Sequence, residues 1–324
     1  MPGKRIDVVV LNYNGRQYIE KCLESLLSQT ADGIEILVLD NGSTDDSLNF
    51  TRKKFPGVKV EEIGRNLGFS RGHNLGISMT DGEFYSTLNT DVELEPDFYE
   101  KLREALLEDS DCGAVTGKLY QLNKYAREDK ILYTTGHLLQ RDYTTVNRGI
   151  NEYDRGQYET RGEVFGVNGA APLYRRKMLE DIRTGKKYLD SSLFMYGADL
   201  DVDWRMRTMG WKCAYCPEAV GYHHGGRDAN FKVFKIRLQA YVQRYLILTK
   251  YLNAEDVIDN IYPLMRSEFL RLLFMVRHDK KVLATLPFCL LYYLPHGLIE
   301  RRLIRMRRRI ASDYIRKWAG LTKG

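Results

Sequence analysis

Residues 83–98 read EFYSTLNTDVELEPDF, a stretch that begins with aromatic and apolar residues and ends in a cluster of acids before Pro96. Its first part has the composition of a buried strand, and Pro96 stands where a proline is common in the first turn of a helix. Burying an unpaired carboxylate is costly, so we expect the acids around Asp91 either at a solvated strand end or around a positive ligand.

The same change from apolar to polar residues occurs earlier in the chain. IDVVVLNY (6–13) and IEILVLDNGS (34–43) are β-branched runs that end in polar residues, and VKVEEI (58–63) is a further strand-like run. Helical patterns separate these runs and cover residues 19–27, 48–54 and 70–79.

This alternation predicts an α/β fold, with a mostly parallel sheet covered by helices on both faces. Ligands of such sheets bind beyond the carboxyl ends of the strands. We therefore expect Asn12, Asp40 and the segment from Asn89 to Asp91 to share one crevice. After about residue 230 the pattern is largely helical.

The bulk composition is that of a soluble globular protein. The chain has 324 residues, 44% of them hydrophobic and 28% charged, which suits one large α/β domain with appendages or two modest domains. Its five cysteines are scattered and the first residues do not resemble a secretory signal, so we expect a reducing, cytoplasmic setting.

Phosphate-binding loops of the common kinds are missing from the sequence. It has no G-x-x-x-x-G-K-[ST] and no G-x-G-x-x-G after the first strand, which disfavours P-loop enzymes and dinucleotide dehydrogenases. A bound nucleotide would then be held by side chains at strand ends and by a metal ion. Asp91 is the candidate ligand for Mg²⁺ or Mn²⁺, which prefer oxygen ligands.

Five segments in sequence order carry a family resemblance: VVVLNYNG, LVLDNGSTDDS, GRNLGFSRGHNLGI, LNTDVELEPDF and MYGADLDVDWRMRTMGW. Together they resemble nucleotide-sugar glycosyltransferases with the GT-A fold, the large inverting family of cellulose-synthase-like and cell-wall sugar transferases. The bacterial rhamnosyltransferase-like branch is the most similar. The resemblance covers about residues 5–226.

The resemblance implies a GT-A domain over residues 1–228 and a helical, basic region over residues 229–324. Within the GT-A domain, residues 1–120 form the nucleotide-binding half and residues 121–228 the acceptor and catalytic half. Nucleotide-sugar binding is implied for Asn12, Asp40, Asn66, Arg71, Asn74 and Asn89. Asp40 is expected to bond the pyrimidine base.

The metal site is implied by Asn89-Thr90-Asp91, which matches the family's D-x-D motif. Asp91 would bind Mn²⁺ or Mg²⁺. Asn89 replaces the first acid of the motif, a change common in this branch. His223 aligns with a late histidine that often joins the metal or the diphosphate; the alternative is a structural histidine.

The catalytic base is implied by Ala198-Asp199-Leu200-Asp201, which matches an acidic motif that usually begins Glu-Asp. Asp199 falls at the position of the general base, and the alternative is an acid placed at a helix start by the helix dipole. Ala198 departs from the usual Glu and leaves open an inactive homologue. Acceptor binding is implied for Asn168, Gly169, Trp204 and Arg205.

The activity implied is the transfer of a sugar, such as rhamnose or another hexose, with inversion in cell-surface polysaccharide synthesis. The donor would be linked to dTDP or UDP, and the acceptor would be a glycan or a polyprenyl-diphosphate-linked sugar. The alternatives are an inactive binding or scaffold protein and a sugar nucleotidyltransferase, although the latter would need a glycine-rich, basic first loop.

Cys213 and Cys216, followed by His223 and His224, superficially resemble a zinc site. The two cysteines lie in a strand-like run, where positions three apart face opposite sides of the sheet. This disfavours zinc.

The C-terminal region combines an apolar stretch with a basic tail. Residues 282–299 contain no formal charge, and residues 296–324 hold nine Arg or Lys against two acids, a net charge of +7 when the whole chain carries +6. Pro287, Pro295 and Gly297 argue against a straight membrane-spanning helix. We expect residues 269–324 to bind an anionic membrane surface. The protein would then be a peripheral protein at the inner face of the cell membrane. The alternatives are a buried helical pair and, without a supporting motif, nucleic acid.

Overall fold

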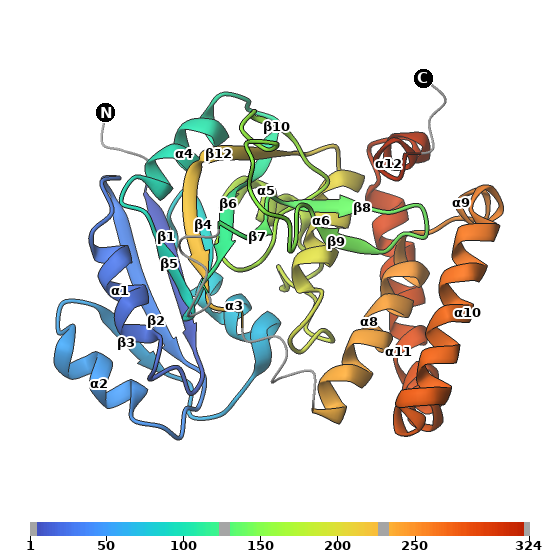
Figure 1. Cartoon of the computed structure of the whole chain (residues 1–324), viewed down its shortest axis with the longest axis horizontal. Coiled ribbons are helices and arrows are strands. Elements are labelled where there is room, and N and C mark those ends of the chain that lie inside the picture. Colours follow the sequence, from blue (N-terminus) through green and yellow to red (C-terminus); the bar gives the residue numbers. More distant parts are fainter. Residues whose placement is uncertain (1–4, 123–129, 226–232, 321–324) are drawn as a thin grey trace.

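The computed structural model describes residues 5–122, 130–225 and 233–320. A large mixed sheet lies between two layers of helices, and a bundle of C-terminal helices packs at one end (Figure 1). The sheet comprises β1 (Ile6–Asn12), β2 (Ile34–Asp40), β3 (Lys59–Glu62), β4 (Phe84–Asn89), β5 (Val92–Leu94), β6 (Cys112–Gln121), β7 (Leu132–Thr134), β10 (Gly162–Glu163), β11 (Leu173–Arg175) and β12 (Lys212–His223).

The sheet order is β10-β12-β6-β11-β4-β1-β2-β3, with β5 paired to β12 and β7 to β6. The predicted strands of the first 90 residues are confirmed, and β3, β2, β1 and β4 are parallel neighbours. Beyond β4 the sheet becomes mixed, because β11 runs antiparallel to both β4 and β6. A separate hairpin is formed by β8 (His137–Leu139) and β9 (Thr145–Asn147).

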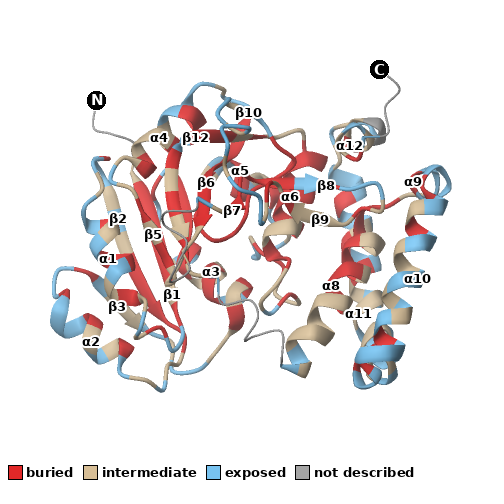
Figure 2. Cartoon of the chain, in the orientation of Figure 1, coloured by how far each residue is buried: buried red, intermediate tan, exposed pale blue. Residues whose placement is uncertain are grey.

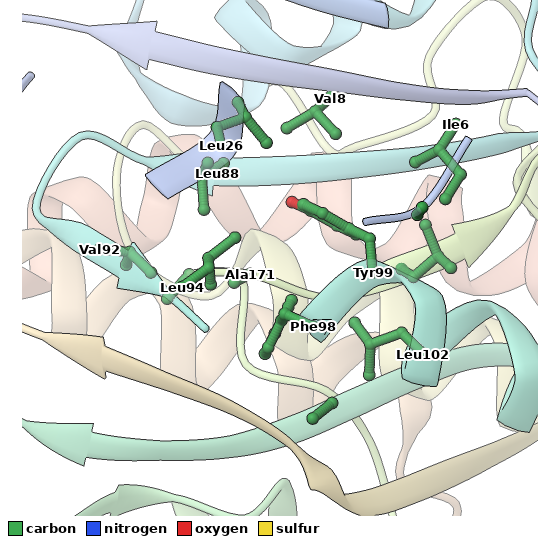
Figure 3. Packing of buried hydrophobic residues seen from close by; sticks show 14 of the residues in the cluster. Ile6, Val8, Leu26, Leu88, Val92, Leu94, Phe98, Tyr99, Leu102 and Ala171 are labelled. Atoms are coloured by element: carbon green, nitrogen blue, oxygen red, sulfur yellow. The ribbon is translucent and has the colours of Figure 1, made fainter. Parts of the chain in front are cut away.

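The helices of the α/β part are α1 (Ile19–Leu27), α2 (Ser47–Lys54), α3 (Gly68–Ser78), α4 (Phe98–Leu107), α5 (Arg176–Ile182) and α6 (Ala198–Thr208). Successive residues of β1 face opposite sides, so Val8 joins the core under α1 and α4, while Val9 joins the core under α3, α5 and α6. Figure 3 shows the first core, where Leu88 of β4 lies near Tyr99 of α4. Burial on both faces explains why β1 is apolar at nearly every position.

The C-terminal helices are α8 (Phe234–Tyr251), α9 (Ala254–Asp259), α10 (Ile261–His278), α11 (Lys280–Arg307) and α12 (Ser312–Trp318). Pro287 and Pro295 do not end α11, which continues through both prolines for 28 residues. Its residues Val282 and Leu286 pack with Leu246 of α8 in a shared cluster, so tertiary packing offsets the bonds that the prolines cannot make. Among the described residues, α11 is the helix that is long and apolar enough to cross a membrane. Its most apolar window of 18 residues has a mean hydropathy of 1.6, and 17% of that window is buried.

The C-terminal helices share their core with the α/β part. The indole of Trp204 in α6 stacks on Tyr251 of α8, with ring centroids 5.1 Å apart and an interplanar angle of 17°. Lys250 donates to Asp201 of α6 at 3.0 Å and is paired with Glu300 of α11 at 2.6 Å. These contacts tie α8 and α11 to the helix that carries Asp199. The predicted division at residue 228 lies outside the described residues, as does Lys323 of the basic tail.

Candidate active site

The ends of β1 and β2 place Asn12 directly beside Asp40. The Asn12 amide donates to Asp40 Oδ1 at 2.9 Å, and Asp40 Oδ2 accepts from the Ser43 N–H at 3.0 Å. Both side chains are 1% exposed, so in this arrangement they fix the turn after β2. The carboxylate that was expected to bond a pyrimidine base is thus turned inward, and residues 41–43 follow it directly at the end of β2.

Two side chains of α3 are hydrogen-bonded to the backbone of the segment that leads into α6. Asn74 Oδ1 accepts from the backbone N–H groups of Tyr188 and Leu189, both at 2.9 Å, and its amide donates back to the Leu189 carbonyl. Arg71 Nε donates to the Ser191 carbonyl at 3.3 Å. Asn74 and Arg71, which were predicted to contact the nucleotide, therefore bind the backbone of residues 188–191 in this structure.

Asn66, the third predicted residue of this stretch, lies at the turn before α3. Its Oδ1 accepts from the Asn41 amide at 3.1 Å and from the Gly68 N–H at 2.8 Å. Asn41 directly follows Asp40 at the end of β2, so Asn66 joins the α3 entrance to the β2 strand end.

Asp91 and His223 come together from distant parts of the chain. His223 ends β12 opposite Val92 of β5, and its Nε2 lies 3.4 Å from Asp91 Oδ1. Adjacent ligands of an octahedral Mg²⁺ or Mn²⁺ ion, with bonds of about 2.1 Å, lie about 3 Å apart. The Asp91 side chain is 21% exposed, so substrate oxygens can reach the same point. The pair fits a hard divalent cation.

His223 is oriented by its surroundings. Tyr133 stacks on the ring with centroids 4.2 Å apart, and the Gly225 N–H donates to Nδ1 at 3.0 Å. With Nδ1 accepting, the proton of a neutral ring is on Nε2, facing Asp91. Coordination through Nε2 would require that proton to leave and the hydrogen bond from the Gly225 N–H to Nδ1 to rearrange.

A second group of possible metal ligands is formed by Asp190, His296 and Glu300, with their ligand atoms within 4.8 Å of one another. Lys250 is already bonded to Asp190 and, at 2.6 Å, to Glu300. Burial would raise the pKa of Asp190, but Lys250 holds it well below its usual range. We assign this group to a buried ion cluster that joins α8 and α11 to the segment before α6.

Asp199 lies in the first turn of α6, after Gly197, which adopts a φ of 81° that favours glycine. Its Oδ2 accepts from the Gly169 N–H at 3.0 Å, and its side chain is 20% exposed. Ala198, at the position of the family's Glu, is 1% exposed and packs in the core under α3, α5 and α6.

The segment Gly169–Ala170 links the two acidic motifs. Asn89 donates its N–H to the Ala170 carbonyl at 2.9 Å, and Thr87 Oγ1 donates to the Gly169 carbonyl at 2.7 Å. The same Gly169 bonds Asp199 through its N–H. The predicted base and the strand end that leads to Asp91 are therefore both hydrogen-bonded to one two-residue segment.

The expected acceptor residues divide into two groups. Asn168 and Gly169 lie in the linking segment, where Asn168 donates to Asn147 at 3.1 Å. Trp204 and Arg205 are a correction: they are 2% and 3% exposed, and Arg205 donates to the Ile182 and Tyr188 carbonyls. Both belong to the core between α6 and its neighbours, because the helical period turns them away from the face that carries Asp199.

The structure also argues against zinc at the two cysteines of β12. Cys213 and Cys216 are fully buried in different cores, on opposite faces of the sheet. One ion cannot bridge them.

Two residues that the sequence did not single out adjoin Asp199. His137 of β8 lies with Nδ1 2.6 Å from Asp203 Oδ2 and with Nε2 3.9 Å from Asp199 Oδ2. Burial raises the pKa of Asp203 to about 6, and His137 opposes that rise. The spacing of Asp199 and Asp203, four residues apart on one helix face, was a usable signal. His137 lies in GHLLQ (136–140), a short β-like piece of the less regular region 121–165, and no sequence pattern joined that piece to Asp199.

The model of the Glycosyl transferase family 2 matches residues 7–183 of this chain. The N-acetylglucosaminyl-diphospho-decaprenol L-rhamnosyltransferase of Mycobacterium tuberculosis is 26% identical over 247 residues, which cover 69% of this chain and 78% of that protein. The glycosyltransferase GlyA of Streptococcus pneumoniae is 29% identical over 185 residues, 55% of this chain. The chain spans 25% of the length of GlyA and 49% of that of EpsH from Bacillus subtilis.

Solved structures share the fold. The S. aureus TarS 1-349 structure aligns with a TM-score of 0.57 at 16% identity, covering 98% of this chain and 90% of that one. The mannosyltransferase PcManGT from Pyrobaculum calidifontis, solved in complex with GDP-Man and Mn²⁺, aligns with a TM-score of 0.52 at 17% identity, covering 99% and 86%. Both alignments extend over the C-terminal helices as well as the α/β part.

Proposed function

The chain belongs to the glycosyl transferase family 2, and on that premise we propose that it transfers a sugar from a nucleoside diphosphate donor to a glycan or polyprenyl-diphosphate-linked acceptor. The observation that carries the proposal is the hydrogen-bonded segment Gly169–Ala170, which joins the Asn89 strand end to Asp199. A dTDP- or UDP-linked donor and a role in cell-surface polysaccharide synthesis are the parts of the proposal that the family resemblance implies. The name of the rhamnosyltransferase among the relatives supports rhamnosyl transfer to a polyprenyl-diphosphate-linked acceptor. Rhamnose is therefore the first sugar to test.

The reaction needs one base and a stabilised leaving group. Asp199 takes the proton of the acceptor hydroxyl while that oxygen bonds to the anomeric carbon, and the bond to the diphosphate breaks with its electron pair leaving on the diphosphate. Asp91 and His223 would hold Mn²⁺ or Mg²⁺, and the bound ion would supply positive charge for the leaving diphosphate. With one carboxylate acting as base and none as nucleophile, the displacement is single and inverts the anomeric centre.

Ala198 favours a second candidate function, that of an inactive homologue which binds the donor without transferring it. Its methyl group is buried where the family usually has a Glu. The strand-end framework and the Asp91–His223 pair would still bind a nucleotide sugar in such a protein.

The first experiment measures the release of nucleoside diphosphate from a set of UDP-, dTDP- and GDP-sugars, with Mn²⁺, with Mg²⁺ and with EDTA. We expect metal-dependent release from one pyrimidine-linked sugar, because water can replace the acceptor at a low rate. Donor binding without release, for every sugar and with acceptor glycans added, would favour the inactive homologue. Absence of both binding and release would contradict a nucleotide-sugar site.

We also propose that the outer face of α10 and α11 binds an anionic membrane surface. Figure 2 shows pale blue exposed segments along both helices. The exposed apolar side chains of the two helices are Ile261, Tyr262, Met265, Phe269, Leu270, Leu272, Phe274, Val276, Phe288, Leu291, Tyr292, Leu298, Ile299, Leu303 and Met306. Exposed basic residues lie among them at Arg277, Lys280, Lys281, Arg302 and Arg305. Each basic residue near an anionic surface contributes about 1 kcal/mol, so apolar and basic groups favour the same partner.

Because α11 is packed against α8 on its other side, we expect it to lie along the membrane. Gly297 faces Leu246 and Thr249 of α8, and Arg301 donates to the Thr249 carbonyl at 2.6 Å. Crossing the membrane would break these contacts or pull α8 away from Trp204 and Asp201.

Flotation with lipid vesicles tests this surface. The full-length protein should float with vesicles of phosphatidylcholine and phosphatidylglycerol at low salt and should bind pure phosphatidylcholine vesicles several-fold less. The double substitution Phe288→Glu and Tyr292→Glu should reduce flotation at least tenfold, whereas Leu107→Glu, at an exposed apolar position of α4, should not. A protein that stays soluble at low salt and ignores anionic vesicles would contradict the proposal.

A further inference from the structure

His137 occupies a position between two acids of one helix. Its ring is 4% exposed, with Nδ1 2.6 Å from Asp203 Oδ2 and Nε2 3.9 Å from Asp199 Oδ2. The two ring nitrogens point in different directions, so a single imidazole connects a fully buried acid with the partly exposed Asp199.

Asp203 is held in place by the backbone around it. Its carboxylate is 0% exposed, and its Oδ1 accepts from the Val167 N–H at 3.0 Å. A Cβ on Gly166 would lie 1.9 Å from the Asp203 Cγ, so the absence of a side chain there makes room for the carboxylate. The Gly166 carbonyl in turn accepts from the His137 N–H at 2.8 Å. This segment, β8 and α6 together fix the spacing between the imidazole and both acids.

A carboxylate buried this completely requires a proton or a cation beside it. A protonated His137 meets that requirement for Asp203 and also places positive charge next to Asp199.

We propose that His137 is a positioning residue for the transfer reaction: held by Asp203, its protonated ring places a positive charge beside the Asp199 carboxylate, which accepts the proton of the acceptor hydroxyl. The role of His137 in catalysis rests on the proposed function, in which Asp199 is the base of sugar transfer. The acceptor proton moves to Asp199 and stays there as the diphosphate leaves, and His137 keeps both of its own protons throughout.

Other titratable groups near Asp203 do not compete for this role. Burial raises the pKa of Tyr174 in β11 and of Cys213 in β12 well above their ordinary values, so both stay neutral at physiological pH. Arg207 of α6 donates to the Phe165 carbonyl at 2.9 Å and is also paired with Glu163. The Arg207 guanidinium is thus bonded to Phe165 and paired with Glu163.

The protonation state of His137 can be measured without any activity. In full-length protein labelled with ¹⁵N-histidine, the resonances of the six histidines are assigned with the help of His137→Gln. At pH 7.5 we expect both nitrogens of His137 to be protonated, and we expect Asp203→Asn to make the ring neutral at the same pH. A neutral His137 in the unmodified protein at pH 7.5 would overturn the proposal, whatever the transfer assay gives.

The catalytic meaning is tested by the pH dependence of nucleoside diphosphate release between pH 5 and 9. His137→Gln and Asp203→Asn should each move the acid limb of kcat upward by about one pH unit, with the KM for the donor nearly unchanged. His73→Gln is the matched control, because His73 is buried and bonded to Tyr85 at 2.9 Å, and it should leave the limb in place. An equal loss at every pH would indicate a purely structural role and contradict the proposal. If the unmodified protein releases nothing from any donor, the proposed function fails, and the NMR result alone decides the state of His137.

Discussion

Replacing Asp199 with Asn is expected to lower sugar transfer by about 10²- to 10⁴-fold, the range that general base catalysis contributes. An amide has nearly the shape of a carboxylate, but it cannot take a proton from the acceptor hydroxyl. The side chain is 20% exposed and accepts from the Gly169 N–H at 3.0 Å and from the Leu200 N–H at 2.9 Å. The amide oxygen of Asn can still accept the bond from Gly169. The measurement is kcat for nucleoside diphosphate release, with donor binding followed separately by thermal shift.

The separation of catalysis from folding is what makes this variant informative. We expect donor binding to stay within about threefold and the free energy of unfolding to change by less than about 1 kcal/mol, as for most substitutions of partly exposed polar groups. Asp32→Asn is the matched control, since Asp32 lies away from the site and pairs with Arg103 at 2.6 Å. Transfer by Asp199→Asn at the unmodified rate would remove Asp199 from the reaction.

Local patterns were sufficient to predict the first half of the fold. The strands from Ile6 to Asn89 are short apolar runs that end in polar turns, and each pairs with a neighbour from the same half of the chain. The sequence alone therefore predicts that the residues at the ends of these strands lie close together. The acids of residues 83–98 are at that edge, and the structure places Asp91 beside His223.

The second half depends on contacts that no local pattern reveals. The pairing of β12 with β6 and β5 joins segments about 100 residues apart, as in the Lys212 to Cys112 register. Trp204 was assigned to the acceptor because it follows Asp199 in the motif, yet the helical period directs it toward Tyr251 of α8. His137 was missed as a site residue because its partners Asp199 and Asp203 come from α6. Residues 121–165 show only short β-like pieces, and no local pattern placed them beside that helix.

Replacing Asp91 with Ala is expected to abolish the metal-dependent part of nucleotide binding and to lower transfer by about 10³-fold, since charge neutralisation at a leaving diphosphate is worth several kcal/mol. Asp91 is one of the two proposed metal ligands, and its carboxylate lies 3.4 Å from His223 Nε2. Without that carboxylate the His223 ring alone offers a weak site for a hard cation. In the unmodified protein, UDP or dTDP with Mn²⁺ at about 100 times its Kd should stabilise the fold by about 2.7 kcal/mol. The variant should show only the smaller, EDTA-insensitive stabilisation from contacts at the strand ends.

The matched control is Glu93→Ala, which removes an equal charge from the same acidic cluster. Glu93 pairs with His224 at 3.0 Å and with Lys21 at 4.0 Å. It lies two residues after Asp91, in β5, opposite Tyr222 of β12. Its loss should leave the Mn²⁺-dependent thermal shift intact, because the Glu93 carboxylate is paired with His224 and Lys21. If Asp91→Ala and the unmodified protein are stabilised equally by nucleotide with Mn²⁺, the cation does not bind at Asp91, and the charge for the leaving group must come from another part of the chain.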